Sequence, residues 1–299
     1  MPTHVRGVIG WRRQTEAQLR KGEQTVRISV SYFQQQKAKS LPIVMLTAYD
    51  ATTARIAEQA GIQVLLVGDT LGMVVQGHDT TIPVTLEEML YHTRLVVRGT
   101  ERAFVIGDLP FMTYNISSDQ ALTNAARFLQ QAGAQSVKLE GGRHMAPTIH
   151  RLVENGIPVM AHIGLTPQSV HQIGGWRVQG RTKATAIRLL DDARAVEDAG
   201  AYAVVLELVP VELAALISQR LQIPTIGIGA GPGCDGQVQV WHDILGLFEA
   251  FVPKHTHQYA KLGEAMRAAI ATYKTEVEQR LFPTGAHAAS MDANLLAEL

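Results

Sequence analysis

The sequence has one cysteine, few charged residues and no long hydrophobic run, and each shortage excludes a class of protein. A single cysteine, Cys234, in 299 residues excludes an intrachain disulfide and gives no sign of an oxidising compartment. The most apolar stretch, residues 201–217, is interrupted by two glutamates and a proline. No segment therefore approaches the ~20 apolar residues of a membrane span. We expect neither a membrane protein nor a disulfide-stabilised secreted domain.

Charge is both scarce and balanced. Lys and Arg total 27, Asp and Glu total 27, and only 18% of residues are charged, against roughly a quarter in an average soluble domain. A nucleic-acid binder or membrane-surface protein normally carries a basic excess, so neither partner is expected. The 46% hydrophobic content excludes a disordered chain. Few surface charges also fit a homo-oligomer that covers part of its surface.

The first 24 residues lack the features of a targeting segment. They contain no apolar core of the kind found in signal peptides, and they include Glu16 and Glu23, which transit peptides avoid. We interpret residues 1–24 as an N-terminal extension and predict a cytoplasmic protein.

Eight short apolar runs alternate with helix-like segments along the rest of the chain. The predicted strands are 43–46, 64–67, 104–106, 136–139, 158–160, 203–206, 224–228 and, more weakly, 250–252. The predicted helices include 50–60, 85–98, 118–132, 184–199 and 211–221. Apolar runs of this length suit strands that are buried on both faces, as in a parallel sheet.

This rhythm predicts the fold class. Eight strands in about 260 residues of alternating β and α match an α/β protein with a single (β/α)₈ TIM barrel. An open, doubly wound sheet is the alternative. No linker or change in composition divides the chain, so we predict one catalytic domain over residues 25–285, followed by a polar tail over residues 286–299.

Ionisable residues follow five successive predicted strands. In chain order they are Asp69, Asp108, Glu140, His162 and Glu207. The carboxyl ends of parallel strands meet at one face of such a fold, so these side chains should converge there. Four carboxylates without cations would repel one another. A bound divalent cation relieves the repulsion, and oxygen ligands favour Mg²⁺ or Mn²⁺.

Lys138 lies two residues before Glu140 and therefore points to the same face of its strand. A buried lysine needs an anionic partner. Two partners remain open at this point: Glu140 itself, or the carboxylate of a substrate.

The segment 226–237, IGIGAGPGCDGQ, is rich in glycine and follows the seventh predicted strand. Many barrels bind phosphate there, but the segment lacks the spacing of the known phosphate-binding motifs. A tight turn or a close backbone approach to a ligand is an equal possibility. Cys234, within it, has no neighbour that suggests nucleophilic chemistry.

Several long motifs closely resemble those of the ketopantoate hydroxymethyltransferase family. They are LTAYD (46–50), VGDTLGMVVQGHDTTIPVTLEEMLYHT (67–93), GDLPFMTY (107–114), KLEGG (138–142), AHIGLTPQS (161–169), LELVPVELA (206–214) and IGIGAGPGCDGQ (226–237). They occur in order and with family-like spacing, over roughly residues 25–285.

The resemblance implies a barrel of the phosphoenolpyruvate/pyruvate type, usually assembled as a decamer. It also implies transfer of a one-carbon unit from 5,10-methylenetetrahydrofolate to 3-methyl-2-oxobutanoate, giving 2-dehydropantoate in pantothenate biosynthesis. One Mg²⁺ per subunit would stabilise the enolate of the 2-oxoacid.

The same resemblance assigns roles to individual residues. Asp69, Asp108 and Glu140 correspond to the metal site; Asp69, Thr70, Asp108 and Lys138 correspond to substrate contacts; Glu207 corresponds to the general base. The family commonly has serine where this chain has Thr70, which keeps the hydroxyl and adds a methyl group. Tyr49 and His162 also lie in family motifs and are further candidates for the pocket.

Two other functions fit the same residues. A Mg²⁺-dependent lyase or mutase of 2-oxoacids would share the acid cluster, although such lyases often use a cysteine-bearing loop and Cys234 lies in no such motif. A non-catalytic small-molecule binding protein would explain a pocket but would leave Glu207 without a role.

Overall fold

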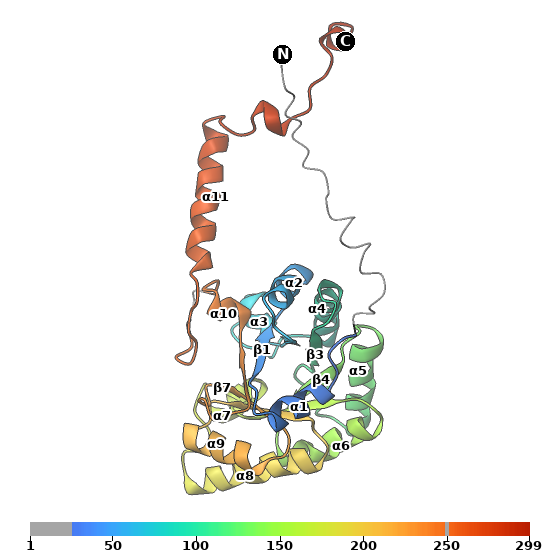
Figure 1. The fold of residues 1–299 in the computed structure, drawn as a ribbon, viewed down its shortest axis with the longest axis vertical. Coiled ribbons are helices and arrows are strands. Elements are labelled where there is room, and N and C mark those ends of the chain that lie inside the picture. The colour runs from blue at the N-terminus through green and yellow to red at the C-terminus, as the bar shows by residue number, and fades with distance from the viewer. Residues whose placement is uncertain (1–25, 249–250) are drawn as a thin grey trace.

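The computed structural model describes residues 26–248 and 251–299 (Figure 1). Eight parallel strands form a closed barrel in chain order, with β1 paired to both β2 and β8. The strands are β1 (Ile43–Thr47), β2 (Val64–Val67), β3 (Phe104–Asp108), β4 (Ser136–Glu140), β5 (Val159–Gly164), β6 (Ala203–Glu207), β7 (Thr225–Ile228) and β8 (Gly236–Gln239). The predicted TIM barrel is confirmed, and the open-sheet alternative is wrong.

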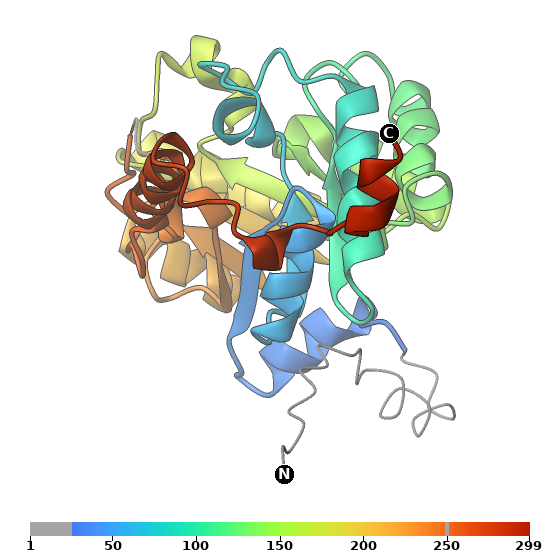
Figure 2. The same ribbon diagram turned by 90° about the horizontal axis from the view of Figure 1, so that it is seen from above.

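Helices follow most strands and pack against the outside of the barrel (Figure 2). The long ones are α2 (Ala51–Gln59), α4 (Leu86–Gly99), α5 (Ser118–Gln130), α6 (Ala146–Glu154), α8 (Lys183–Asp198) and α9 (Val211–Arg220). Short helical turns are α3 (Leu71–Val74), η1 (Arg143–Met145), η2 (Pro167–Ser169), α7 (Val170–Ile173) and α10 (Trp241–Ile244). Side chains cap several N-termini; Thr85, for example, accepts from the N–H of Glu88 at the start of α4.

Alternate residues of the strands point into the barrel and form its inner core. This inner cluster includes Ile43, Met45, Val64, Leu66, Ile106, Met160, Val205, Ile226 and Val238. At the amino end of the strands, α1 (Ser31–Ala38) closes the barrel with Phe33, whose ring lies 5.3 Å from Phe104 and 4.8 Å from Tyr202. The barrel is thus a packed core that opens only at the carboxyl ends of its strands.

The eighth strand differs from the prediction. Phe251 and Val252 belong to no strand, and Ala250 lies outside the described residues. The strand that closes the barrel, β8, instead lies inside the glycine-rich segment 226–237 and just beyond it. This strand has no run of apolar residues, partly because it begins with Gly236. A larger residue does not fit there, since an added Cβ would lie 2.5 Å from the carbonyl oxygen of Ile43. Close packing of β8 on β1 therefore requires glycine where a strand normally has a branched residue.

The C-terminal part of the chain extends away from the barrel (Figure 1). It contains α11 (Leu262–Glu278), η3 (Gly285–His287) and α12 (Ala293–Ala297). None of the residues of α11 is buried. The predicted boundaries of the barrel domain at residues 25 and 285 stay predictions, and the extension 1–24 lies outside the described residues.

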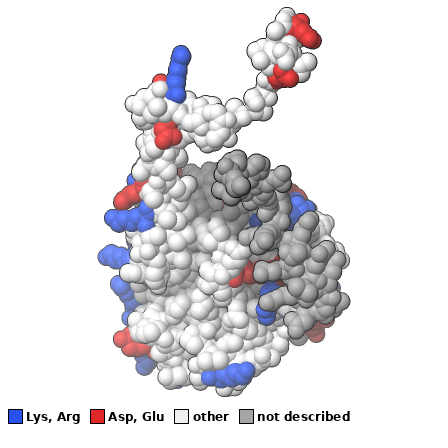
Figure 3. Space-filling model, turned by 45° about the horizontal axis from the view of Figure 1, so that its top comes forward, with Lys and Arg blue, Asp and Glu red and all other residues white. Residues whose placement is uncertain are grey.

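Charged side chains are spread thinly over the surface. On the face drawn in Figure 3, basic and acidic residues lie among broad uncharged areas, as the balanced composition predicts. Among the described helices, none is both long enough and apolar enough to cross a membrane. The cytoplasmic location stays a prediction.

Candidate active site

The inward-facing rows of the barrel end in ionisable groups at the carboxyl ends of the strands. Asp108 continues the row of Phe104 and Ile106 on β3, and Glu207 continues the row of Ala203 and Val205 on β6. The strand register places Asp108 beside Lys138, and Glu140 beside His162. Because side chains alternate between the two faces of a strand, the spacing of these residues in the sequence places them together at the carboxyl end of the barrel.

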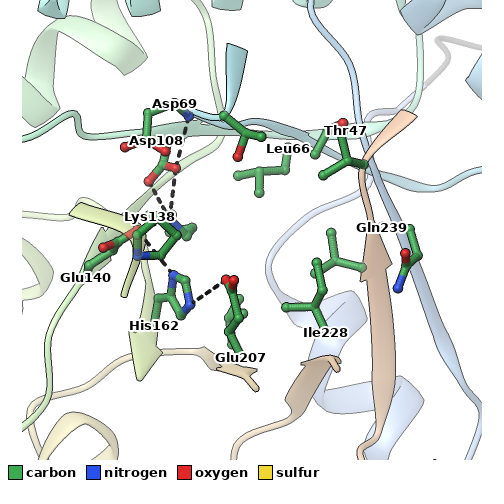
Figure 4. Close-up of a pocket in the computed structure, with 15 residues that line it drawn as sticks. Thr47, Leu66, Asp69, Asp108, Lys138, Glu140, His162, Glu207, Ile228 and Gln239 are labelled. Carbon is green, nitrogen blue, oxygen red and sulfur yellow. Dashed lines mark hydrogen bonds and ion pairs between the residues drawn. The ribbon is translucent and has the colours of Figure 1, made fainter. Parts of the chain in front are cut away.

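These side chains line a single cavity (Figure 4). Its lining consists of Thr47, Leu66, Asp69, Thr70, Asp108, Lys138, Glu140, His162, Pro167, Val205, Glu207, Ile228, Val238, Gln239 and Val240. The residues predicted as metal ligands, substrate contacts and general base are all among them, and so is His162. In Figure 4 the ionisable groups lie on one side, and Ile228 lies across from them. Thr47 and Gln239 lie on the same side as Ile228, so the cavity has a charged wall and an opposite wall of apolar and neutral polar side chains.

Lys138 pairs mainly with Asp108 and not with the nearer residue in sequence, Glu140. Its Nζ donates to both carboxylate oxygens of Asp108, at 2.7 and 2.8 Å, and lies 3.7 Å from Oε1 of Glu140. Burial alone would lower the pKa of the lysine, but the charges of Asp108, Glu140 and Asp69 outweigh it and raise the pKa. Lys138 is therefore a permanently charged group inside the barrel.

Asp69 and Asp108 are close together and fully buried. The backbone N–H of Asp69 donates to Oδ2 of Asp108 at 3.3 Å. Burial, followed by the charges of Asp108 and Glu140, raises the pKa of Asp69 well above its usual value. Burial also raises the pKa of Asp108, despite the opposing effect of Lys138. One lysine does not balance the charges of Asp69, Asp108 and Glu140, so a further cation would be favoured beside them.

His162 lies between Glu140 and Glu207. Its Nδ1 is 3.5 Å from Oε1 of Glu140, and its Nε2 is 3.2 Å from Oε2 of Glu207, although neither contact has hydrogen-bond geometry. Burial and Lys138 lower the pKa of His162, but the two glutamates raise it to about 9. Burial would raise the pKa of Glu140, but Lys138 and His162 together lower it. Glu140 is thus ionised, and a cationic imidazole lies beside Glu207.

A glycine at the end of β5 allows that strand to lie close to β6 at Glu207. Gly164, the last residue of β5, adopts φ +94°, and an added Cβ there would collide with the carbonyl oxygen of Glu207. Only glycine accepts both constraints without strain. The close approach of β5 to β6 therefore depends on this position.

Two buried polar residues of the site escaped the sequence reasoning. Gln168 lies on η2, and its side-chain Nε2 donates to Oδ2 of Asp69 at 2.8 Å. The hydroxyl of Tyr114 donates to Oε1 of Gln168 at 2.6 Å. Both residues lie within the family-like motifs, but no apolar periodicity or charge pattern marked them.

The remaining candidates have other positions. Tyr49 is buried with its ring 5.5 Å from that of His242, and it is not among the residues that line the cavity. The glycine-rich segment 226–237 contains most of β7, the connection to β8 and the first two residues of β8. A close backbone approach to a ligand stays a prediction. Cys234 is half-buried, and burial raises the pKa of its thiol, which makes it a poor nucleophile.

The donor set suits Mg²⁺ but is incomplete as a protein-only site. In the described part of the chain, no three His, Cys, Asp or Glu side chains are arranged so that they would hold a metal ion by themselves. Mg²⁺ does not need such a group, because it commonly binds one or two carboxylates and completes its shell with water and substrate. Oε1 of Glu140 is buried without a hydrogen-bond partner, as expected where a further ligand or its water shell belongs. The residues present therefore fit a divalent cation.

Comparison with known proteins agrees with this geometry. Residues 27–285 match the profile of the family described as ketopantoate hydroxymethyltransferase. A 3-methyl-2-oxobutanoate hydroxymethyltransferase of Chloroflexus aurantiacus is 58% identical over 272 residues, covering 91% of this chain and 96% of that protein.

Solved structures of other proteins have the same (β/α)₈ barrel fold. A phosphoenolpyruvate phosphomutase from Streptomyces platensis subsp. rosaceus superposes with a TM-score of 0.57 at 16% identity, covering 91% of this chain and 95% of the other. A 2,3-dimethylmalate lyase of the PEP mutase/isocitrate lyase superfamily gives 0.55 at 16% identity, covering 90% and 97%. These two likenesses show the fold. With the family profile spanning the barrel and a 58% identical relative, the chain belongs to the ketopantoate hydroxymethyltransferase family.

Proposed function

We propose that this protein transfers a one-carbon unit from 5,10-methylenetetrahydrofolate to 3-methyl-2-oxobutanoate and produces 2-dehydropantoate, a step of pantothenate biosynthesis. One observation carries the proposal: Glu207 shares a cavity with the Asp69–Asp108 pair, and apolar side chains such as Ile228 also line that cavity. A branched 2-oxoacid has matching parts, namely a chelating end, an acidic C–H beside the ketone and an apolar end.

The acids at one side of the cavity would hold Mg²⁺. Asp69 and Asp108 are the proposed direct ligands, and Glu140 is the third acid of the site, acting directly or through water. When bound, the cation would act as a Lewis acid toward the ketone and carboxylate oxygens of the substrate. Lys138, already charged and buried, would contact the substrate carboxylate, and the Thr70 hydroxyl would donate to it.

Glu207 is the proposed general base. Its carboxylate would take the proton from C3 of the 2-oxoacid, and the electron pair of that C–H bond would become the enolate. C3 would then form a bond with the methylene carbon of the folate, and both bonds between that carbon and the folate nitrogens would break. A water molecule would supply hydroxide to the same carbon, which completes the hydroxymethyl group. The proton taken from C3 and the remaining proton of the water would go to the two folate nitrogens. The His162 cation, 3.2 Å from Glu207, would fix the orientation of the carboxylate.

The substitution Glu207→Gln tests the base. It should slow the exchange of the C3 hydrogen with deuterated solvent about 100- to 10,000-fold, because the amide cannot accept the proton. Exchange is followed by NMR in the presence of Mg²⁺, and the binding of Mn²⁺ serves as the control, which should change little. Normal exchange in the variant would exclude Glu207 as the base. Cleavage of 2-oxoacids by the wild-type protein without folate would favour a lyase instead.

We also propose that the protein is a homo-oligomer in which α11 packs on a second copy. Apolar side chains line one side of α11 at intervals of three and four residues, and all are 38–62% exposed: Leu262, Met266, Ile270, Tyr273 and Val277. The outside of the barrel also exposes an apolar residue beside β8. Val44 on β1 is 54% exposed, and the helix that directly follows β8, α10, has only four residues. Each copy thus offers the helix that the other lacks.

The substitution Ile270→Glu tests this assembly. A charge in the centre of the apolar stripe should lower the molar mass measured by light scattering to that of a smaller species. Ala268→Glu, on the other side of the same helix, is the control and should leave the mass unchanged. An unchanged mass for Ile270→Glu would contradict the proposed role of α11.

A further inference from the structure

Gln168 is a neutral residue buried among the ionised groups of the site. It is 5% exposed, and every polar atom of its side chain is hydrogen-bonded. Nε2 donates to Oδ2 of Asp69 at 2.8 Å and to the carbonyl oxygen of Leu109 at 3.0 Å. Oε1 accepts from the hydroxyl of Tyr114 at 2.6 Å. The amide therefore joins the loops that follow β2, β3 and β5.

The orientation of this amide is fixed by its neighbours. If the amide were flipped, its oxygen would face the carbonyl oxygen of Leu109, which only accepts hydrogen bonds, and its N–H groups would no longer reach Asp69. Buried polar atoms without partners are costly, so the flipped form is excluded. The N–H groups of Gln168 therefore point toward Asp69 and Leu109.

The backbone of Gln168 is hydrogen-bonded to a second carboxylate, that of Glu140. Its N–H donates to Oε2 of Glu140 at 3.0 Å. Oε1 of Glu140 accepts no hydrogen bond, and within the described residues Oδ1 of Asp69 accepts none either. Each carboxylate thus has one oxygen that is hydrogen-bonded to Gln168 and one oxygen without a hydrogen bond. The second oxygen of Glu140 lies 3.7 Å from Nζ of Lys138 and 3.5 Å from Nδ1 of His162.

We infer that Gln168 is a positioning residue for the cation site: it holds carboxylates from two strands in the orientation in which their remaining oxygens serve Mg²⁺. Tyr114 completes the arrangement, because its hydroxyl also accepts from the backbone N–H of Glu140 at 3.2 Å. This inference rests on the proposed metal site. Groups that orient metal ligands typically contribute 10- to 100-fold to metal affinity.

The substitution Gln168→Met tests the inference, because methionine fills a similar volume and removes the side-chain hydrogen bonds. We expect the Kd for Mn²⁺, measured by EPR without substrate, to rise about 10- to 100-fold. With substrate, the metal concentration for half-maximal rate should rise by a similar factor, while kcat at saturating metal changes less than threefold. Tyr114→Phe should raise the Kd for Mn²⁺ less, about three- to tenfold, and it provides the same test if Gln168→Met fails to fold.

Gln135→Met is the matched control. Gln135 lies at the other end of the barrel, where its side chain accepts from the N–H of Val105 at 2.7 Å and donates to the carbonyl of Gly133 at 2.9 Å. It should lower Tm and leave the Kd for Mn²⁺ unchanged. If Gln168→Met and Tyr114→Phe likewise lower Tm without weakening Mn²⁺ binding, both residues are merely structural and the inference is wrong. If the wild-type protein binds no Mn²⁺, the proposed metal site itself fails.

Discussion

The two ends of the barrel each contain a lysine–aspartate pair, and the pairs have opposite surroundings. At the amino end, Lys37 Nζ lies 2.8 Å from Oδ2 of Asp235. At the carboxyl end, Lys138 Nζ lies 2.7 Å from Oδ1 of Asp108. The chemistry of the two pairs is the same, so their difference shows what separates a structural ion pair from a functional one.

The pair at the amino end is complete. Asp235 also accepts from the backbone N–H of Thr225 at 2.8 Å and from its hydroxyl at 3.0 Å, and Lys37 donates to the carbonyl of Ser218 at 2.9 Å. One acid faces one cation, and side chains around the pair supply further hydrogen bonds. This arrangement fastens α1 and the β7–β8 connection to the bottom of the barrel.

The pair at the carboxyl end is outnumbered by acids. Lys138 is surrounded by Asp108, Asp69 and Glu140, and burial with mutual repulsion raises the pKa of Asp69. The protein keeps these groups together at a cost in stability, which binding of the proposed cation would offset. Both ends of the barrel have a lysine–aspartate ion pair. The end with the cavity differs because several acids surround its lysine.

The largest expected effect is that of Lys138→Met. Removing one partner of a buried ion pair leaves uncompensated charge, so the free energy of unfolding should fall by about 3–5 kcal/mol. Loss of the proposed substrate contact should also lower kcat/KM at least about 100-fold. Urea denaturation and steady-state assays measure the two quantities. Full activity in a stable variant would mean that the carboxyl-end pair is dispensable.

A smaller effect is expected for Lys37→Met at the amino end. This lysine is partly exposed, at 19%, so the loss in unfolding free energy should be only about 1–2 kcal/mol. No residue of this pair lines the cavity, and kcat/KM should be unchanged at a temperature where the variant is folded. The same denaturation series and assay apply. A drop in kcat/KM comparable to that of Lys138→Met would show that the two ends are not functionally separate.

The barrel itself could be predicted from the sequence wherever local apolar runs coincide with strands. The run at 64–67 matches β2, and the segment at 118–132 contains α5. The prediction failed at β8 because its sequence, GQVQ, is short and contains a glycine that only the contact with Ile43 explains. Such a contact exists only after the barrel has closed, and no local pattern records it.

The site was predictable where charge follows an apolar strand and unpredictable elsewhere. Asp108 and Glu207 end inward-facing rows, so the twofold period of a strand brings them to the mouth. Gln168 and Tyr114 lie on loops, and their role depends on contacts between segments far apart in sequence. The resemblance to the family supplied the individual roles, which spacing alone left open.

The exposed α11 has a consequence for how the protein completes its fold. If the helix that covers β1 and β8 comes from a second copy, the last step of folding is bimolecular and follows mass action. The thermal midpoint should then rise with protein concentration, and no single-chain free energy describes the native state. The strands of one chain close the barrel, but a helix from a second copy would complete the layer of helices around it.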